Sequence, residues 1–255
     1  MRAIKTFTLL LAASVLLSAC GGGAGRVGKF WNKTDITVTE NNYSEAQDRF
    51  AEFAELSVSV SPRQALAALD KLFDKLKSDD VSYYVYSEWL VAAYHSLLSP
   101  CRNPDLFAQC AEHFRTDGIM AECDYSPLVE LSDKDMLNHE GAEVSLPELL
   151  DSDGQPLPSA EGEEALYAVI NLDCATCVSA LRALADKPGR HIAICFGHTP
   201  APLIEGWEYA YPRDIDNYFD LDAAPFWFTV SADGHVTTPY SMVPETNVFA
   251  TPDNQ

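Results

Sequence analysis

The sequence has little positive charge and no hydrophobic run long enough for a permanent transmembrane helix. Lys and Arg together number 17 against 38 Asp and Glu, which gives a formal net charge of −21 over 255 residues. A surface of this sign repels phosphate backbones, so the composition argues against nucleic-acid binding. The apolar run Phe7–Leu17 is shorter than the roughly 20 residues that a membrane-spanning helix needs.

Motifs of several common enzyme classes are also absent. The sequence contains no G-x-S-x-G, no phosphate-binding P-loop and no H-E-x-x-H. A G-x-G-x-x-G match at Gly23–Gly28 follows no strand, as a dinucleotide-binding fingerprint must. The acidic run at 214–222 is not an EF-hand, because Phe219 stands where that loop needs Gly. Apolar residues nevertheless make up 47% of the chain, enough for a packed core.

The N-terminus has the pattern of an export signal. Arg2 and Lys5 precede the apolar run, which ends in small residues before Cys20. The segment 17–20 resembles the lipobox of bacterial lipoproteins, in which the cysteine receives a diacylglyceryl group and becomes the first residue. The resemblance implies a signal peptide at 1–19, a lipidated Cys20 with a flexible tether at 20–40, and anchoring to a membrane of the cell envelope, facing the periplasm. A plain signal peptide with a chance cysteine is the alternative.

Residues 41–140 are predicted to form a small all-α domain. Two capping boxes, at 44–47 and 61–64, indicate helix starts. Apolar residues recur at helical spacing after the second box and again between Tyr86 and Leu97. A third helix is predicted from Asn103-Pro104 to Gly118.

Residues 141–255 are predicted to form an α/β domain. The runs Ala165–Leu172 and His191–Phe196 are apolar on both faces, as strands buried in a helix-covered sheet are. Between them, Cys174–Asp186 has helical spacing, which completes a β-α-β unit. Phe226–Val230 and His235–Thr238 flank an Asp-Gly turn and indicate a β-hairpin.

The chemistry of this sequence centres on Cys174-Ala175-Thr176-Cys177. This C-x-x-C directly follows a buried strand and begins a helix, where free amide groups and the helix dipole stabilise a thiolate. The second cysteine lies within the first turn, close enough to form a disulfide with the first. A dithiol in this position can exchange with a substrate disulfide.

A strand, a C-x-x-C, a helix and a second strand, followed by Ala224-Pro225 and a hairpin, resemble the thioredoxin superfamily. The resemblance implies a central sheet with flanking helices, Cys174 as nucleophile and Cys177 as resolving cysteine. It also implies that Pro225 is a cis-proline facing the C-x-x-C across a substrate groove, with Ala224 before it. No closing C-terminal helix is predicted, because 239–255 is polar and contains proline.

The helical half extends the likeness. Ser99-Pro100, Arg102-Asn103 and 137–141 resemble the region before the thioredoxin domain in lipid-anchored thioredoxin-like proteins of Gram-negative bacteria. The resemblance implies protein thiols or disulfides as substrates and an upstream redox protein as electron partner. It implies no cofactor beyond the redox-active disulfide and the lipid on Cys20. On this reading the protein is an enzyme, a thiol–disulfide oxidoreductase.

Some positions depart from the thioredoxin pattern. Asp173 replaces the usual Trp before the first cysteine, where its carboxylate either opposes thiolate formation or caps the helix. Ala165 occupies the place of a buried carboxylate that assists proton transfer, for which Glu163 or Glu164 is a candidate substitute. These departures favour the alternative of a non-catalytic binding or scaffold lipoprotein with a structural disulfide.

The remaining cysteines leave further alternatives open. Cys174, Cys177, Cys195 and His198 have the spacing of a structural zinc site, although Cys195 lies within an apolar strand. Three more candidates for a structural disulfide lie in the helical half: Cys101, Cys110 and Cys123. One pair of these three can form a staple, or all can be buried thiols, or some can join His113 at a metal. The main interpretation assigns no metal to the protein.

Overall fold

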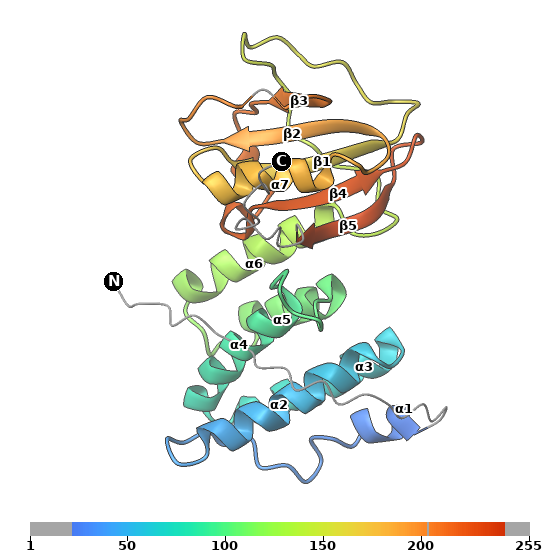
Figure 1. The fold of residues 1–255 in the computed structure, drawn as a ribbon. Helices are drawn as coiled ribbons and strands as arrows, with labels where there is room; N and C mark the ends of the chain where they lie inside the picture. The colour runs from blue at the N-terminus through green and yellow to red at the C-terminus, as the bar shows by residue number, and fades with distance from the viewer. Residues whose placement is uncertain (1–21, 203, 243–255) are drawn as a thin grey trace, which may run out of the picture.

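Between residues 22 and 242, the protein forms a run of six helices followed by a sheet with one long helix packed on it (Figure 1). The computed structural model describes residues 22–202 and 204–242. The first helices are α1 (Gly22–Val27), α2 (Tyr43–Val58), α3 (Pro62–Leu76), α4 (Asp80–Tyr94), α5 (Pro104–Thr116) and α6 (Glu122–Leu137). In this described part, no helix combines the length and the apolar character needed to cross a membrane.

Local signals set the helix starts. The capping box at Ser61 is present, with Gln64 Oε1 accepting a hydrogen bond from the Ser61 amide at 3.3 Å. Asn103 caps α5 by accepting a hydrogen bond from the Leu106 amide at 3.0 Å. The capping box predicted at Ser44 is wrong, because α2 begins one residue earlier and Asn42 precedes it.

The helices and residues 22–38 enclose one aromatic-rich core. Its largest side chains are Trp31, Phe50, Phe53, Phe73, Tyr83, Tyr86, Trp89, Tyr94, Phe107 and Phe114. We call residues 22–140 the helical domain.

The flexible tether expected at 20–40 is wrong for most of its length. The chain forms α1 and then runs along the helical domain, where Val27 and Trp31 are each 1% exposed. The Val38 amide donates a hydrogen bond to Ser82 Oγ at 2.7 Å. Burying an indole among other aromatic rings outweighs the conformational freedom of the preceding glycines. The signal peptide at 1–19 and the lipidated Cys20 lie outside the described residues.

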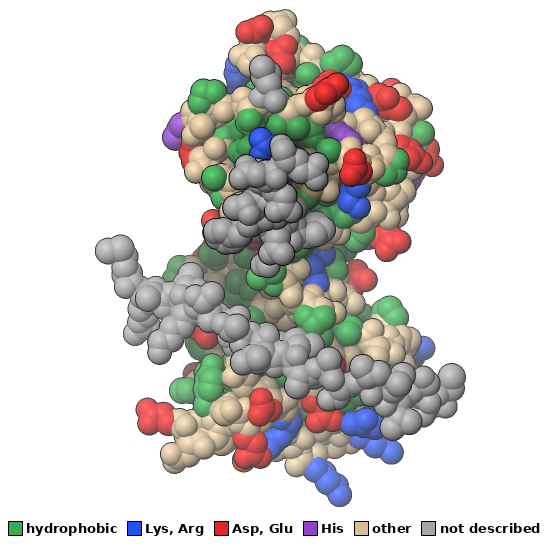
Figure 2. Space-filling model, viewed as in Figure 1, with side chains coloured by type: hydrophobic (Ala, Val, Ile, Leu, Met, Phe, Trp, Pro, Cys, Tyr) green, Lys and Arg blue, Asp and Glu red, His purple; other side chains and the backbone are tan. Residues whose placement is uncertain are grey.

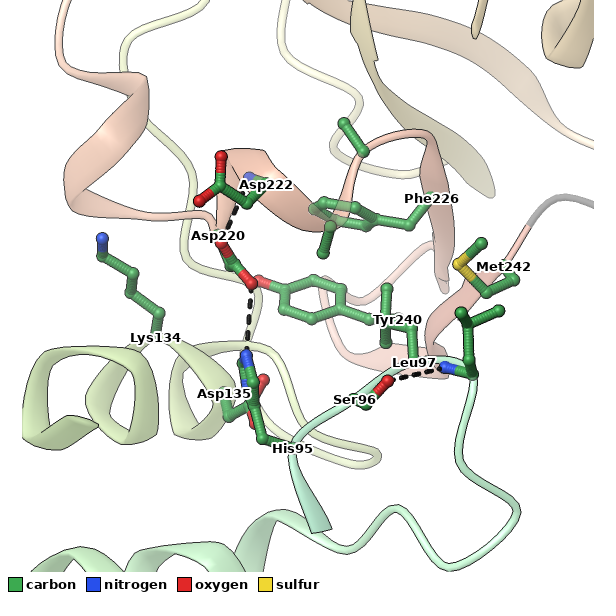
Figure 3. Close-up of a pocket in the computed structure, with 13 residues that line it drawn as sticks. His95, Ser96, Leu97, Lys134, Asp135, Asp220, Asp222, Phe226, Tyr240 and Met242 are labelled. Atoms are coloured by element: carbon green, nitrogen blue, oxygen red, sulfur yellow. Dashed lines mark hydrogen bonds and ion pairs between the residues drawn. The ribbon is translucent and has the colours of Figure 1, made fainter. Parts of the chain in front are cut away.

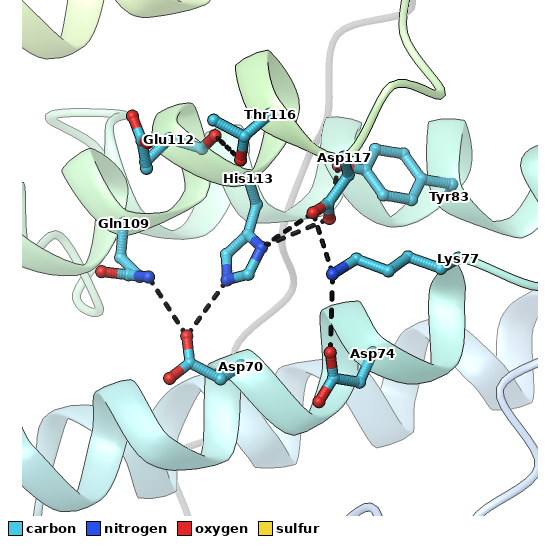
Figure 4. A network of polar contacts seen from close by, with 9 residues as sticks. All are labelled: Asp70, Asp74, Lys77, Tyr83, Gln109, Glu112, His113, Thr116 and Asp117. Atoms are coloured by element: carbon cyan, nitrogen blue, oxygen red, sulfur yellow. Dashed lines mark hydrogen bonds and ion pairs between the residues drawn. The ribbon is translucent and has the colours of Figure 1, made fainter.

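His113 belongs to a polar network between α3 and α5 (Figure 4). Its two ring nitrogens lie 3.0 Å from Asp70 Oδ1 and 3.2 Å from Asp117 Oδ2. Lys77 Nζ reaches Asp117 Oδ1 at 3.0 Å, and the imidazole stacks on Phe73 at 4.1 Å. Each ring nitrogen of His113 therefore has a carboxylate partner within the helical domain.

The sheet confirms the predicted β-α-β unit and hairpin. Its elements are β1 (Ala165–Asn171), α7 (Ala175–Leu184), β2 (Arg190–Phe196), β3 (Trp207–Ala210), β4 (Phe226–Val230) and β5 (Val236–Met242). The strand order is β3-β2-β1-β4-β5, with β1, β2 and β3 parallel and β4 antiparallel to both β1 and β5. We call residues 141–242 the α/β domain; residues 243–255, where no closing helix is predicted, lie outside the described part.

The two faces of the sheet are covered differently. α7 packs on one face, where Leu181 and Leu184 meet Leu166 and Ile170. The other face is covered by segments without long helices. Among the side chains packed on this second face are Leu146, Leu149, Leu157, Ile215 and Phe219, together with Leu97 from the helical domain. The helical domain therefore contributes directly to the core beneath the sheet.

Candidate functional site

The C-x-x-C lies where β1 ends and α7 begins. Cys174 is the residue before the first helical residue, and its sulfur accepts a hydrogen bond from the Cys177 amide at 3.3 Å. It thus satisfies one of the free amides of the helix with its own sulfur. Cys174 is half-buried, whereas Cys177 is 2% exposed and packs beneath the sheet.

The pKa values of the two thiols are shifted in opposite directions. Hydrogen bonds from the Cys177 thiol and from the Thr176 hydroxyl, whose oxygen is 3.0 Å from the Cys174 sulfur, lower the pKa of Cys174. Burial raises the pKa of Cys177 to about 11. One accessible cysteine is therefore favoured as thiolate, while its neighbour stays protonated.

Asp173 does not cap the helix. Its carboxylate accepts hydrogen bonds from the amides of His198 and Thr199 at 3.1 and 2.9 Å, and from Thr199 Oγ1 at 2.7 Å. These bonds hold the pKa of Asp173 below its usual value. The side chain ties the loop before α7 to the loop after β2, which corrects the capping prediction.

The loop after β2 is shaped to receive this carboxylate. Gly197 has φ +103°, and a Cβ there would lie 2.9 Å from both Asn171 Oδ1 and Asp173 Oδ2. A side chain at 197 would therefore collide with the two residues that support the C-x-x-C loop.

The prediction that Glu163 or Glu164 replaces the buried carboxylate that assists proton transfer is wrong. Glu163 and Glu164 are both exposed, and Glu163 pairs with Arg190 Nη1 at 3.3 Å. Ala165 is 2% exposed within the core. The acidic side chains that precede β1 thus face solvent at the opposite end of the strand from Cys174.

Pro225 lies at the same edge of the sheet as the C-x-x-C. The Ala224-Pro225 peptide bond is cis. Because Phe226 pairs with Val169 in the antiparallel ladder, the next residue back, Pro225, lies beside the carboxyl end of β1. Cys174 follows that end directly, so the topology brings together the residues that the sequence paired.

A cavity of about 330 Å³ opens between the two domains next to this edge (Figure 3). Ala224 lines it from the α/β domain, and residues 95–98 line it from the helical domain. Its polar side contains His95, Asp135 and Asp220. Figure 1 shows α6 between the other helices and edge strand β5, and the molecule narrows at this junction (Figure 2).

His95 joins the domains through two carboxylates. Its Nδ1 lies 2.8 Å from Asp135 Oδ2 on α6, and its Nε2 lies 3.2 Å from Asp220 Oδ2 of the α/β domain. Burial alone would lower the pKa of His95, but the hydrogen bonds and charges of these carboxylates raise it to about 9. The imidazolium thus donates to both domains at neutral pH.

Two residues from the motifs of the helical half complete this junction. Arg102 Nη2 donates to Asp135 Oδ1 at 2.8 Å. Asn138 Nδ2 donates to the Tyr240 hydroxyl of β5 at 2.8 Å. The sequence analysis assigned no role to His95 or Asp220, because 125 residues separate the two partners.

Comparison with known proteins adds one structural likeness. No family model matches the chain, and no curated protein matches it. The crystal structure of a thioredoxin-like protein from Bacteroides caccae superposes with a TM-score of 0.71 at 14% sequence identity. The match covers 94% of this chain and 96% of that one, so it includes the helical part.

The fold is thioredoxin-like. The alternative zinc site is not formed in it: Cys195 is buried in β2, where its thiol donates to the Ala193 carbonyl at 3.4 Å. Within residues 22–202 and 204–242, no three His, Cys, Asp or Glu side chains are placed to hold a metal ion. This also removes the metal alternative for His113.

The structural disulfide considered for the helical half is not formed either. The six cysteines of the described chain are all free thiols. Cys101 and Cys110 are buried in the helical core, and Cys123 is exposed at the start of α6. The core around Cys101 and Cys110 is already closely packed with aromatic side chains, so these thiols behave as small hydrophobic groups.

Proposed function

We propose that the protein is a thiol–disulfide oxidoreductase of the cell envelope, with Cys174 as nucleophile and Cys177 as resolving cysteine. The observation that carries the proposal is the different surroundings of these two neighbouring thiols: Cys174 is half-buried at the start of α7, with the Cys177 amide and the Thr176 hydroxyl beside its sulfur, whereas Cys177 is buried. An accessible thiolate attacks a substrate disulfide, and a buried thiol beside it waits for the mixed disulfide.

The exchange balances without an organic cofactor. The Cys174 thiolate attacks one sulfur of the substrate disulfide, forms a mixed disulfide and releases the other substrate sulfur as a thiolate. Cys177 then loses its proton and attacks the Cys174 sulfur, which releases the second substrate thiol. The substrate gains two electrons, and the protein is left with a Cys174–Cys177 disulfide. A dithiol of an upstream redox protein restores it, and the same steps in reverse oxidise a substrate dithiol.

Pro225 and Ala224 form the wall of the substrate groove in this proposal. They lie beside the carboxyl end of β1, which Cys174 follows in the chain. A substrate segment held against this wall brings its disulfide to the nucleophile. The Asp173 hydrogen bonds keep the C-x-x-C loop in place while the mixed disulfide forms and breaks.

Export and lipid anchoring belong to the same proposal. Their support is the lipobox-like segment ending at Cys20 and the charged residues before the apolar run. Since α1 begins at Gly22, a lipid on Cys20 would hold the helical domain close to the membrane surface. Replacing Cys20 with Ala is expected to move the protein from the membrane fraction to the soluble fraction; retention there would contradict the anchor.

The competing function is a binding scaffold with a fixed disulfide. Asp173 favours it, because a negative charge next to Cys174 opposes the thiolate. The two functions differ in the reduction potential of the Cys174–Cys177 pair. Equilibration in graded thiol–disulfide buffers, followed by alkylation and mass spectrometry, measures this potential.

An oxidoreductase is expected to show one two-electron transition between about −120 and −270 mV. A pair that stays oxidised below about −300 mV is a structural disulfide and would refute the enzyme. The matched control is Cys195→Ser, which removes a buried thiol of the same domain and should leave the potential unchanged.

A further inference from the structure

The charged residues of the chain are unevenly distributed. All 38 Asp and Glu residues follow residue 34, and the first of them is Asp35. Within 26–33, by contrast, Arg26, Lys29 and Lys33 occur without a single acidic residue. A chain with a net charge of −21 thus begins its described part with a segment of the opposite sign.

The fold brings two further lysines to this segment. Lys71 Nζ on α3 donates a hydrogen bond to the Gly28 carbonyl at 2.6 Å. One turn later on the same helix, Lys75 Nζ donates to the Thr34 carbonyl at 2.9 Å. In Figure 2 blue side chains gather at the lower end of the helical domain, where Figure 1 places α1. We call the five cations of this surface the basic patch: Arg26, Lys29, Lys33, Lys71 and Lys75.

Few carboxylates oppose the basic patch. Glu52 pairs with Arg26 at 2.8 Å, and Asp35 lies at the border of the patch in the chain. On α3, the Asp74 carboxylate has a partner outside the patch, because Lys77 Nζ lies 3.5 Å from its Oδ1. The cations of the patch thus outnumber the carboxylates beside it, in contrast to the rest of the chain.

The two central lysines of the patch are held outward by the core beneath them. Val27 and Trp31 are four residues apart and are each 1% exposed. Lys29 and Lys33 alternate with them, are exposed, and form no ion pair within the described residues. Two cations that are fixed in place without an intramolecular partner leave their charge available to a partner outside the molecule.

We propose that the basic patch contacts anionic phospholipid headgroups of the membrane that carries the protein, so that α1 and α3 lie against the membrane and the α/β domain is turned away from it. This proposal rests on the lipid anchor of the proposed function. α1 begins two residues after Cys20, and two residues span at most about 7 Å. That distance is within the screening length of about 8 Å at physiological salt, so the anchor keeps the patch within electrostatic reach of the surface.

The charge of the α/β domain reinforces this orientation. Residues 141–255 contain 4 Lys and Arg against 18 Asp and Glu. Figure 1 places this domain at the opposite end of the molecule from α1. An anionic surface attracts the basic patch and repels the acidic domain, which turns the two ends in opposite directions. The C-x-x-C belongs to the end that is turned away, where a protein substrate has access to it.

Vesicle binding measures the patch separately from the lipid. The probe is the mature chain implied by the lipobox, residues 20–255, made without lipid and retaining every described residue. Sedimentation with vesicles of phosphatidylcholine, with or without one third phosphatidylglycerol, gives its affinity for neutral and anionic surfaces. We expect binding to the anionic vesicles alone, at about 0.01 M salt and not at about 1 M, because the screening length falls from about 30 Å to about 3 Å.

Lys29→Gln combined with Lys33→Gln should weaken binding to anionic vesicles roughly tenfold, since a basic residue near such a surface contributes a factor of up to about five. The matched control is Arg182→Gln combined with Arg213→Gln, which removes the same charge from exposed positions of the α/β domain. The control should stay within about twofold of the wild-type affinity. Both double variants should keep the wild-type denaturation midpoint, because all four side chains are exposed.

The orientation is read from the lipidated protein on vesicles. Lys29 and Lys33 should be acetylated several-fold more slowly on anionic than on phosphatidylcholine vesicles, whereas Lys187 of the α/β domain should react equally on both. Labels located by mass spectrometry measure these rates. Slower acetylation of Lys187 to the same extent would contradict the orientation.

Three further outcomes would overturn the proposal. Equal binding to the two kinds of vesicle, or equal losses in the two double variants, refutes the basic patch as a membrane contact. Binding to soluble polyglutamate but not to anionic vesicles would assign the patch to an acidic protein instead. Fractionation of Cys20→Ala tests the anchor alone, so failure of the anchor and failure of the patch are distinguishable.

Discussion

Both domains contain buried cysteines whose thiols are kept protonated, but the α/β domain also has a half-buried cysteine at the start of a helix. In the helical domain, Cys110 is completely buried, and burial raises the pKa of its thiol well above the usual value. In the α/β domain, burial likewise raises the pKa of Cys195 to about 12. Cys174 alone among these has its pKa lowered, because it stands at a helix start with donors around its sulfur. Placement at an element boundary, rather than residue type, makes a cysteine reactive.

The domains also differ in what holds them together. The helical domain has one aromatic core, whereas the second face of the sheet lacks a long helix and takes Leu97 from the helical domain. Two hydrogen bonds join them beside this apolar contact, one between His95 and Asp220 and one between Asn138 and Tyr240, and Asp135 of the helical domain holds both His95 and Arg102. The helical domain therefore supports the sheet and shapes the cavity, while the redox pair belongs to the α/β domain.

The largest expected effect comes from exchanging the reactive cysteine. Cys174→Ser should abolish disulfide reduction, by at least about a thousandfold, because an alcohol is not ionised near neutral pH. The free energy of unfolding should change little, since Cys174 is half-buried. Cys110→Ser should do the reverse, leaving the single-turnover rate intact and lowering the denaturation midpoint. Loss of activity in Cys110→Ser, with folding intact, would show that a buried thiol of the helical domain takes part in the reaction.

The next largest effect is expected at the junction between the domains, where Asp135 pairs with His95 and Arg102. Asp135→Ala leaves Arg102 and the protonated His95 without their shared partner, and breaking such a buried pair costs about 3–4 kcal/mol. Urea unfolding monitored in both domains measures this loss, and we expect the two domains to unfold in separate transitions. Asp133→Ala is the control, because Asp133 is exposed on the same helix. Equal effects of the two substitutions would contradict the role of the junction.

The same junction should make stability depend on pH. His95 has a pKa raised to about 9 in the folded protein, so its contribution is complete below about 6.5, the unfolded value, and is lost as pH rises through 9. Over that window the free energy of unfolding should fall by about 2–3 kcal/mol. Urea titrations between pH 6 and 10 measure the fall. His95→Gln should flatten the curve, and a wild-type curve that is already flat would refute the bridging imidazolium.

The smallest expected effect concerns the hydroxyl beside the Cys174 sulfur. Thr176→Val removes the hydroxyl 3.0 Å from the Cys174 sulfur, so the pKa of Cys174 should rise. Its rate of alkylation at pH 7 should then fall roughly threefold. Thr176→Ser keeps the hydroxyl and should keep the rate. If Ser and Val behave alike, the hydroxyl does not stabilise the thiolate.

Short-range patterns in the sequence were enough to predict much of the fold. The apolar runs of β1 and β2, the C-x-x-C helix and the Asp-Gly hairpin all occur as predicted, because each depends on neighbouring residues. α6 was not predicted as a separate helix, since Pro127 interrupts a weakly amphipathic segment.

The errors share a physical cause, which is contact between residues far apart in the chain. Glycines indicated a tether, but Trp31 finds its place against Phe53 and Tyr86, 4.8 and 6.0 Å between ring centroids. Asp173 adjoins the nucleophile in sequence, yet its partners are His198 and Thr199 on another loop. No local sequence pattern indicates such distant partners. The cavity between the domains is likewise lined by residues far apart in the chain, such as His95 and Asp220.

The most direct test of the redox account is the pH dependence of alkylation at each cysteine. The fully reduced protein is treated with iodoacetamide for short times between pH 5 and 11, and the labels are located by mass spectrometry. We predict that Cys174 reacts before Cys177 and Cys195, with a midpoint below the ordinary thiol value of about 8.5, while these two buried thiols stay protected. A Cys174 midpoint at or above that value, or equal reactivity of Cys174 and Cys177, would contradict it.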